Sequence, residues 1–473
     1  MTANELSAQG AFAEAQAAYL NPDPDTVADL RARLERARAG VVAHFYMGAE
    51  LQGTLYACDW PHIHVSDSLA MADRAIAMAE AGMQNLIVLG VDFMSENVRA
   101  MVDAAGRRDV GVYRVSREPI GCSLAESAES RAYGAYLRKA AATPRSLHVV
   151  YINTSLWTKA HAHNLVPTIT CTSSNVVQTV LQAFAQEPEL HLWFGPDTYM
   201  GANLAALFEG LTELDEAAIR ALHPAHDRRS IAALRGRFDY FKQGNCVVHH
   251  MFGDDVTARV RDEYQDARVT AHLEVPGEMF RLALAAQREG RGVIGSTSDI
   301  LHYITGQVAA AARDASGPRR LKFILGTESG MVTAIVRAVR QVLRDSEAQG
   351  ARGDIEAEIV FPVASEAIAT TRDAERPIVP GVAAGEGCST AGGCATCPYM
   401  KMNSLDATLD VLDGLRVGDA SALVSYEPRK YTETLAGRSV AALGSEPILH
   451  MRGFQRTGAL PGALIDDVRT RVA

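Results

Sequence analysis

The first of three similar stretches in this chain reads Val41-Val42-Ala43-His44-Phe45-Tyr46. The other two read Val149-Val150-Tyr151-Ile152-Asn153-Thr154 and Val269-Thr270-Ala271-His272-Leu273-Glu274. Each begins with apolar residues, which is typical of a strand buried on both faces. Each then places two polar side chains at i and i+2, which share one face of a strand. An internal repeat of this kind predicts three copies of one structural unit.

Two further segments follow each stretch at similar distances along the chain. The first is a hydroxyl-rich turn, which occurs as Asp67-Ser68-Leu69, Thr172-Ser173-Ser174 and Ser296-Thr297-Ser298. The second is an apolar strand that leads to an acidic residue, and it occurs at 86–92, 192–197 and 323–328. Strands that alternate with helices predict an α/β fold of parallel sheets joined by right-handed crossovers. Ligands of such sheets bind beyond the carboxyl ends of the strands, where the polar pairs lie.

The repeats divide the chain into five parts. We predict a helical N-terminal arm at 1–35, a first α/β repeat at 36–121, a second at 122–245 with an insertion near 202–243, a third at 246–410, and a C-terminal extension at 411–473. The hydroxyls of Ser68, Ser173 and Thr297 stand at predicted helix starts, where we expect them to act as N-caps.

Composition excludes several classes of protein. The 473 residues are 48% hydrophobic and 22% charged, with a net charge of −10, which argues against non-specific binding of nucleic acid. No apolar run approaches the roughly 18 residues of a membrane span. The first 21 residues have neither a basic region nor an apolar core, so they do not predict a secretory signal. We therefore predict a cytoplasmic protein with no membrane or nucleic-acid partner.

One cysteine follows each repeat, with a glycine or proline one or two residues away: Cys122, Cys246 and Cys397. These thiols are too far apart in sequence for a zinc finger, whose ligands arrive in close pairs. Three distant thiolates suit an iron–sulfur cluster with one iron left open. On spacing alone, buried structural thiols explain the three cysteines equally well.

The remaining cysteines have simpler interpretations. Cys58 and Cys171 are predicted to be reduced, buried thiols. Cys388 and Cys394 lie beside Cys397, and two readings stay open for them: a redox pair that controls ligand availability, or oxidation-prone loop thiols.

The polar pairs are candidates for acid–base chemistry. Taken singly, a histidine or tyrosine at a strand end is more often a hydrogen-bonded core residue than a catalyst. Three such pairs at equivalent positions of a repeat favour a catalytic role over a structural one. Glu274 is the only carboxylate among them, so it is the best candidate for a general acid or base. Tyr46 and Tyr151 are candidates for donating a hydrogen bond to an oxyanion or for moving a proton. The nearby helix starts are candidates for binding a carboxylate or phosphate.

At this point the chain resembles a known family, the quinolinate synthases, which are iron–sulfur enzymes of de novo NAD biosynthesis. The matching phrases run in order over about 36–410, and they are 43–46 with 50–52, 66–69, 90–96, 122–124, 151–155, 172–174, 195–197, 244–249, 271–274, 295–298 and 397–403. So many matches in one order are far more specific than any single motif.

The resemblance implies three similar α/β domains around a pseudo-threefold axis with a central active-site cavity. It implies a [4Fe-4S] cluster held by Cys122, Cys246 and Cys397. The implied reaction condenses iminoaspartate with dihydroxyacetone phosphate to quinolinate, with loss of phosphate and two waters. The residues that it implies are catalytic Tyr46, His272 and Glu274, and substrate-binding His44, Ser68, Tyr151, Asn153, Ser173 and Thr297.

Two other interpretations remain open from the sequence. One is an iron–sulfur hydro-lyase that acts on a different hydroxy acid, which would share the three thiolates and the open iron. The other is a metal-binding scaffold without activity, which would have no need for polar pairs at the strand ends. The resemblance also implies a partner protein, an L-aspartate oxidase, which would supply the unstable iminoaspartate.

Overall fold

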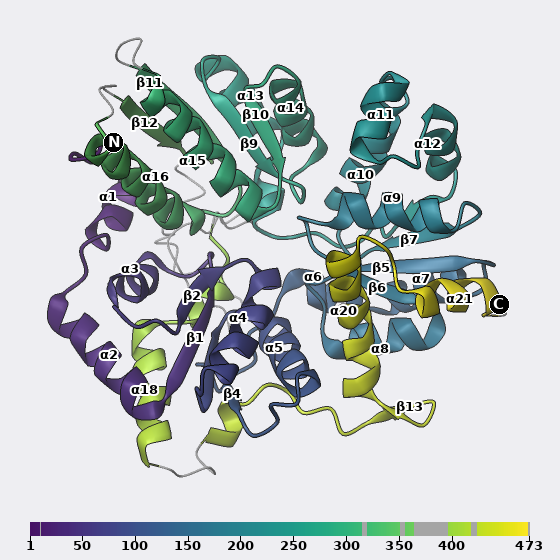
Figure 1. Cartoon of the computed structure of the whole chain (residues 1–473), viewed down its shortest axis with the longest axis horizontal. Helices are drawn as coiled ribbons and strands as arrows, with labels where there is room; N and C mark the ends of the chain where they lie inside the picture. Colours follow the sequence, from purple (N-terminus) through teal and green to yellow (C-terminus); the bar gives the residue numbers. More distant parts are fainter. Residues whose placement is uncertain (10, 315–318, 351–354, 364–395, 418–422, 472–473) are drawn as a thin grey trace, which may run out of the picture. The chain divides into compact units, whose positions relative to one another are not determined.

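The computed structural model describes the chain except for residues 10, 315–318, 351–354, 364–395, 418–422 and 472–473 (Figure 1). Contacts divide the chain into two compact units. The first unit comprises Met1–Ile120 and Val247–Pro428, and the second comprises Gly121–Cys246 and Arg429–Ala473. We describe each unit by itself.

The described residues contain three four-stranded sheets with the same strand order, and every pair of neighbouring strands in them is parallel. The first sheet, in the first unit, contains β2 (Ile63–Ser66), β1 (Ala39–His44), β3 (Asn85–Leu89) and β4 (Gly111–Tyr113) in that order. The second, in the second unit, contains β6 (Thr168–Cys171), β5 (Ser146–Tyr151), β7 (His191–Gly195) and β8 (Phe238–Tyr240). The third, again in the first unit, contains β10 (Gly292–Gly295), β9 (Arg268–His272), β11 (Arg319–Gly326) and β12 (Ile355–Val360). The predicted α/β fold with repeated parallel-sheet units is confirmed.

The register of the strands brings each polar pair next to its hydroxyl turn. His44 pairs with Ser66, Tyr151 with Cys171, and His272 with Gly295. The two segments that the sequence analysis matched therefore meet at the carboxyl edge of each sheet. The strands β1 and β5 are buried along their whole length, which explains their continuous apolar runs.

Helices precede or follow the strands in each repeat. Those of the first repeat are α3 (Ala49–Ala57), α4 (Ser68–Glu80) and α5 (Asp92–Ala104). Those of the second are α6 (Ser123–Ala128), α7 (Arg131–Ala141), α8 (Leu156–Leu165), α9 (Val176–Gln186), α10 (Thr198–Leu211), α11 (Glu216–Leu222) and α12 (Arg228–Arg235). Those of the third are η1 (His249–Met251), α13 (Asp254–Glu263), α14 (Gly277–Arg288), α15 (Thr297–Arg313) and α16 (Met331–Ala348). Figure 1 shows α4 and α5 side by side, packed on the first sheet.

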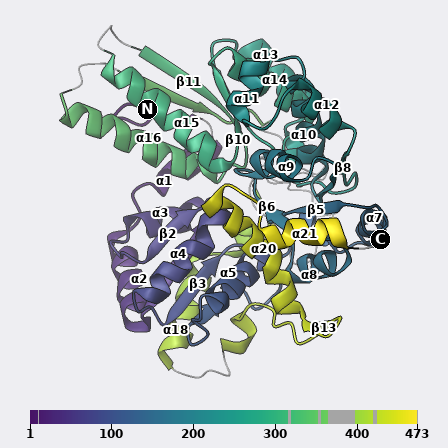
Figure 2. The ribbon, with the colours of Figure 1, turned by 45° about the vertical axis from the view of Figure 1, so that its right-hand side comes forward.

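The terminal segments add further helices. The N-terminal ones are α1 (Ala11–Ala18) and α2 (Pro24–Ala37), and Asp23 caps α2 just before Pro24. After the third repeat come η2 (Met400–Met402), α18 (Leu405–Val417), η3 (Val424–Tyr426), β13 (Thr434–Leu435), β14 (Arg438–Ser439), α20 (Val440–Thr457) and α21 (Gly462–Thr470). Within the second unit, α20 packs against α8 and β6 (Figure 2).

Three details differ from the sequence analysis. Each sheet has two strands that the three repeated segments did not include, namely β2 and β4, β6 and β8, and β10 and β12. Within 202–243, α10 and β8 take the places that α5 and β4 have in the first repeat, and α11 and α12 lie between them.

The predicted N-caps are wrong by one or two residues. Asp67 caps α4 and Ser296 caps α15, while α9 begins after Asn175. Consequently Ser68 and Thr297 occupy the first helical position, and their hydroxyls are not needed as caps.

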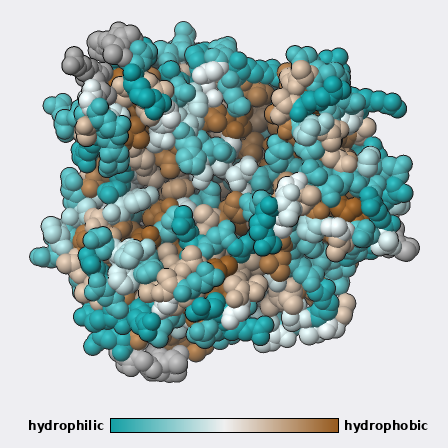
Figure 3. Space-filling view, viewed as in Figure 1, coloured by the Kyte–Doolittle hydropathy of each residue, from teal (hydrophilic) through white to brown (hydrophobic). Residues whose placement is uncertain are grey.

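The described surface mixes polar and apolar residues, as the scattered brown and teal areas of Figure 3 show. Large exposed apolar side chains in the described residues belong to separate elements or loops: Tyr19, Leu222, Val424 and Leu449. Within the described ranges, no helix combines the length and the apolar character needed to cross a bilayer.

Candidate active site

Two histidines at strand ends have the same local geometry. His44 ends β1 and His272 ends β9, and both are buried. The backbone N–H of Tyr46 donates to Nδ1 of His44 at 3.2 Å, and that of Glu274 donates to Nδ1 of His272 at 3.3 Å. Because Nδ1 accepts in both rings, the neutral tautomer carries its proton on Nε2.

Burial keeps both rings uncharged. It lowers the pKa of His44 to about 4, against the opposing charges of Asp67 and Glu274. It lowers the pKa of His272 to about 3, with Glu274 again opposing. Near neutral pH each histidine therefore offers an Nε2–H donor without a positive charge. Such a donor suits a carbonyl or carboxylate oxygen.

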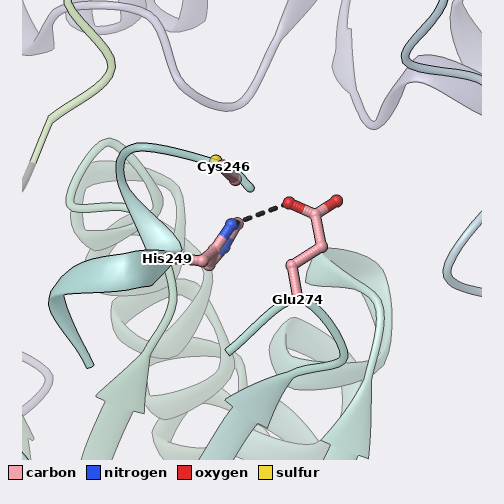
Figure 4. Close-up of side chains that lie close together, drawn as sticks. All are labelled: Cys246, His249 and Glu274. Carbon is pink, nitrogen blue, oxygen red and sulfur yellow. Dashed lines mark ion pairs between the residues drawn. The ribbon is translucent and has the colours of Figure 1, made fainter. Parts of the chain in front are cut away.

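Glu274 faces a histidine that the sequence analysis did not select. Nδ1 of His249, in η1, lies 2.8 Å from Oε2 of Glu274, although its N–H does not point along that line. The rings of His249 and His272 stack at 4.7 Å with an angle of 14°. Figure 4 shows the imidazole of His249 and the carboxylate of Glu274 facing each other, and Cys246 precedes His249 by three residues in the chain. Imidazole and carboxylate are both donors that are able to hold a metal ion.

A threonine joins Tyr46 to His249. Oγ1 of Thr327, directly after β11, lies 3.1 Å from the Tyr46 hydroxyl and 3.2 Å from Nε2 of His249. Thr327 is fully buried. The first unit thus brings the polar pairs of the first and third repeats into one network.

The helix starts of α4 and α15 are also joined. Oγ of Ser298 donates to Oδ2 of Asp67 at 2.7 Å, so the first turns of the two helices are tied together. Ser68 is half-buried and Thr297 is buried at these turns. Helix N-termini carry unpaired N–H groups and a partial positive charge, which favour an anionic ligand.

The second unit carries the remaining predicted substrate-binding residues. Tyr151 ends β5 and is buried, Asn153 follows in the turn, and Ser173 follows the neighbouring strand β6. The buried Nζ of Lys159 donates to the carbonyl of Ile152 at 3.1 Å and to that of Thr154. This lysine therefore fixes the turn that presents Asn153.

Two of the cysteine loops lie side by side within the second unit. Oγ of Ser123, next to Cys122, donates to the carbonyl of Asn245, next to Cys246, at 3.0 Å. Both thiols are partly exposed and neither forms a disulfide. Accessible thiols in neighbouring polar turns are what a shared metal cluster needs.

The third cysteine loop is held inside the first unit. The N–H of Cys397 donates to Oε1 of Glu328 at 3.0 Å. Six residues later, the amide of Asn403 pairs with the backbone of Gly90, donating to its carbonyl at 3.2 Å and accepting from its N–H at 3.0 Å. Cys388 and Cys394 lie outside the described residues.

Accessibility separates the proposed ligands from the other described thiols. Cys122, Cys246 and Cys397 are partly exposed, whereas Cys58 and Cys171 are buried. Burial raises the pKa of both buried thiols, which disfavours the thiolate form that binds metals. The donor chemistry of the three accessible thiols therefore fits an iron–sulfur cluster.

Sequence reasoning missed His249, Thr327, Glu328 and Lys159. His249, Thr327 and Glu328 lie in phrases that matched the family or repeated, and Lys159 lies a few residues after such a phrase, but no role was assigned to any of them. Their roles depend on contacts with chain segments that a linear pattern does not join. Thr327 and Glu328 had one usable signal, because they follow the third strand of a repeat, as Asp92 and Asp197 do in the others.

Comparison with known proteins places the fold in a family. A chloroplastic quinolinate synthase of Nicotiana tabacum is 52% identical over 480 residues, covering 100% of this chain and 66% of its own length. That of Arabidopsis thaliana is 52% identical over 480 residues, covering 99% and 66%. A quinolinate synthase of Synechococcus is 26% identical over 321 residues, covering 67% and 78%. The chain thus spans just under two thirds of the length of these two plant relatives.

The predicted cytoplasmic location is wrong by this comparison, because the plant relatives at 52% identity are named chloroplastic. The error has a physical reason. Reduced thiols and an ordinary soluble composition do not distinguish the cytosol from the interior of a plastid.

The family itself is shown by a family model and by the plant relatives together. The model described as "Quinolinate synthetase A protein" matches residues 28–347, well over half of the chain. The matched region includes each polar pair, each hydroxyl turn and two of the three proposed cysteine ligands. The chain belongs to the quinolinate synthetase A protein family.

Proposed function

We propose that the chain is a quinolinate synthase that condenses iminoaspartate with dihydroxyacetone phosphate, with loss of phosphate and two waters. The observation that carries the proposal is the buried network of Tyr46, Thr327, His249 and Glu274 in the first unit. A scaffold without activity would not need two proton-transferring side chains joined through buried polar groups. Family membership supports the choice of substrates.

The proposed cofactor is a [4Fe-4S] cluster held by Cys122, Cys246 and Cys397. Their partial exposure, and the contact between the loops of the first two, support this assignment. When bound, the cluster would supply a Lewis-acidic iron to a substrate hydroxyl. The arrangement of the three repeats around a pseudo-threefold axis with a central cavity belongs to the same proposal.

The first unit would carry the proton transfers. Glu274 is the proposed general base, since it is a buried carboxylate beside His249. Tyr46 is the proposed partner acid, with its hydroxyl oriented by Thr327. His272 and His44 would donate from Nε2 to substrate oxygens, because their Nδ1 atoms are occupied by backbone N–H groups.

Substrate anions would bind at helix starts and at the turn of the second unit. Ser68 and Thr297 occupy the first positions of α4 and α15, where carboxylate or phosphate oxygens are favoured. Tyr151, Asn153 and Ser173 are the proposed contacts from the second unit. Since an imine hydrolyses in water, a supply of iminoaspartate from an L-aspartate oxidase belongs to the proposal, as does a plastid location like that of the plant relatives.

The test is an anaerobic assay with purified protein, iminoaspartate and dihydroxyacetone phosphate. The proposal expects quinolinate and inorganic phosphate in equal amounts. A hydro-lyase acting on another hydroxy acid would release no phosphate, so phosphate release separates the two activities. Absence of both products in protein with an intact cluster would reject the proposed function.

A further inference from the structure

A salt bridge at the edge of the first sheet has no assigned role. Arg114 directly follows β4 and Asp92 begins α5, and Nη1 of Arg114 donates to Oδ1 of Asp92 at 2.6 Å. The Arg114 side chain is only 11% exposed and that of Asp92 is 31% exposed. A charged pair so far withdrawn from water is held more firmly than an ion pair on an open surface. The other partners of the two side chains therefore indicate what the pair holds in place.

Asp92 binds the residue that stands two positions before a proposed cysteine ligand. Its second oxygen, Oδ2, accepts from the N–H of Ile120 at 3.1 Å, and its own N–H donates to the carbonyl of Ile120 at 3.0 Å. The Ile120 side chain is fully buried. Because both backbone groups of Ile120 are bound, the chain is fixed just before Gly121 and Cys122.

Arg114 braces the same loop and ties it to a segment that is distant in sequence. Its Nη1 also reaches the carbonyl of Glu118 at 3.4 Å, inside the loop 114–120. Its Nη2 donates to the carbonyl of Ser425 at 3.2 Å, and its backbone N–H donates to that of Tyr426 at 2.7 Å. The fork of a guanidinium group can bind a carboxylate and carbonyl oxygens at once, which the single ammonium of a lysine does less well.

Tyr426 makes a second contact with the loop. Nε of Arg117 donates to the Tyr426 hydroxyl at 2.9 Å, and the guanidinium carbon of Arg117 lies 5.3 Å from the centre of the ring. Arg117 is exposed, so we expect this contact to be weaker than those of the buried Arg114. The segment 423–428, the described part that follows α18, is thus joined to the loop at two arginines.

The second repeat has the same backbone anchor without the arginine. Thr198 begins α10 as Asp92 begins α5, and it pairs with Gly244, two residues before Cys246. The N–H of Thr198 donates to the carbonyl of Gly244 at 2.7 Å, and Oγ1 of Thr198 accepts from the N–H of Gly244 at 3.0 Å. A neutral hydroxyl serves there in place of a carboxylate, so that anchor needs no cation to balance it.

We propose that Arg114 is a positioning residue: it ties Asp92 and the loop 114–120 to the segment 423–428, and so keeps Cys122 ready to bind metal. This gives the first part of the C-terminal extension a task. The inference rests on the proposed function for the cluster that the loop would serve. The contacts that carry it lie within the first unit, and none involves a metal-ligand atom.

The first test is Arg114→Met, which keeps the length of the side chain and removes the guanidinium group. We expect iron loss to a chelator at least about 10-fold faster than in the wild type, because partners of ligand-bearing groups typically change metal affinity by that factor. The value of kcat per bound cluster should stay within about 3-fold, since Arg114 is not among the proposed substrate contacts. A purely catalytic role would change kcat and leave iron loss unchanged.

The matched control is Arg99→Met. Arg99 is also partly buried, pairs with Asp103, and donates to the carbonyls of Arg107 and Val110, which precede β4. Both changes remove an arginine–carboxylate pair from the same repeat. A difference in iron loss between them therefore reports the loop before Cys122 rather than a general loss of stability.

The second test needs no metal and no activity. Amide exchange in metal-free Arg114→Met should be faster than in the wild type both at 114–120 and at 423–428, because the tie between them is lost. Arg99→Met should leave both segments unchanged. Arg114→Lys should recover part of the slow iron loss, since an ammonium can still pair with Asp92.

A second variant covers the case in which Arg114→Met does not fold. Tyr426→Ala removes the contact with Arg117 and leaves Arg114 in place. It should raise amide exchange at 114–120 and speed iron loss, by less than we expect of Arg114→Met. Wild-type exchange in this variant would show that the segment does not hold the loop.

The outcomes separate this inference from the proposed function. Wild-type protein without cluster or product would reject the function, while amide exchange in metal-free protein would still test the tie. Wild-type iron loss in Arg114→Met, an equal increase in Arg99→Met, or unchanged exchange at 423–428 would each overturn the inference.

Discussion

The turns after β1 and β5 share an anchor but differ in chemistry. In the first repeat, Nε2 of Gln52 donates to the carbonyls of the two residues that flank Tyr46, at 2.7 and 2.9 Å. In the second repeat, Nζ of Lys159 donates to the carbonyls of the two residues that flank Asn153. Gln52 and Lys159 occupy the same place relative to the strand end. The third repeat has the buried Phe280 there, and the Glu274 N–H to His272 contact braces its turn instead.

The comparison shows that turns at the same place in the fold carry different chemistry in different repeats. All three repeats brace the strand-end turn, but only the first and third place a histidine with a fixed tautomer beside it. The second presents a phenol and an amide, which suit binding better than acid–base work near neutral pH. We therefore expect changes in the third-repeat turn to alter kcat and changes in the second-repeat turn to alter KM.

The largest expected effect is that of Glu274→Gln. Loss of the proposed general base should lower kcat by about 100- to 10,000-fold, with iron content unchanged. Steady-state quinolinate formation measures it. A kcat within 3-fold of wild type would contradict the role of the third repeat.

The matched change in the second repeat is Asn153→Ala. Removing a hydrogen bond to a charged substrate should raise KM by about 10- to 100-fold and leave kcat within about 3-fold. The same assay over a range of substrate concentrations separates the two parameters. If kcat fell as far as in Glu274→Gln, the proposed division between the repeats would be wrong.

Lys159→Met tests the anchor itself. Two buried carbonyls lose their donor, so the second unit should lose about 3 kcal/mol of unfolding free energy. Urea unfolding followed by fluorescence reports it, since Trp157 and Trp193 lie in that unit. Lys159→Gln copies the first repeat and should lose less. Equal losses in the two variants would show that the anchors are not equivalent.

The smallest expected effect concerns pH. Burial lowers the pKa of His148, on β5, to about 3, below its unfolded value of about 6.5. The free energy of unfolding that the neutral His148 ring contributes is fully present above pH 6.5. It is lost as pH falls below 6.5, because His148 then binds a proton in the unfolded chain but not in the folded chain. The loss at pH 5 is about 2 kcal/mol.

His148→Gln should therefore reduce the fall in stability between pH 7.5 and pH 5, as measured by urea unfolding at the two values. His302→Gln is the control, since His302 is exposed. An unchanged fall in His148→Gln would contradict the expectation.

The sequence predicted the repeated strands well because buried parallel strands need continuous apolar runs, as in β1 and β5. It missed the other two strands of each sheet, of which β4 and β8 have only three residues each and carry no such run. It also missed α20, where Pro447 and Gly444 interrupt the helical pattern.

Site residues, like strands, were predicted where the repeated sequence pattern marks them and missed elsewhere. His44 and His272 were found because repeats align them, whereas Thr327 was not selected because its partners lie elsewhere in the chain. The N-caps were misplaced because Asp67 and Ser68 are both good capping residues, and only the direction of the side chain decides between them.

The most direct test of the account is anaerobic analysis of wild type and Cys246→Ser for iron, acid-labile sulfide and quinolinate formation. The account predicts about four irons and four sulfides per wild-type chain, with activity, and the loss of cluster and activity together in the variant. Zinc, or no metal after anaerobic reconstitution of the wild type, would contradict it, and so would a variant that keeps both cluster and product.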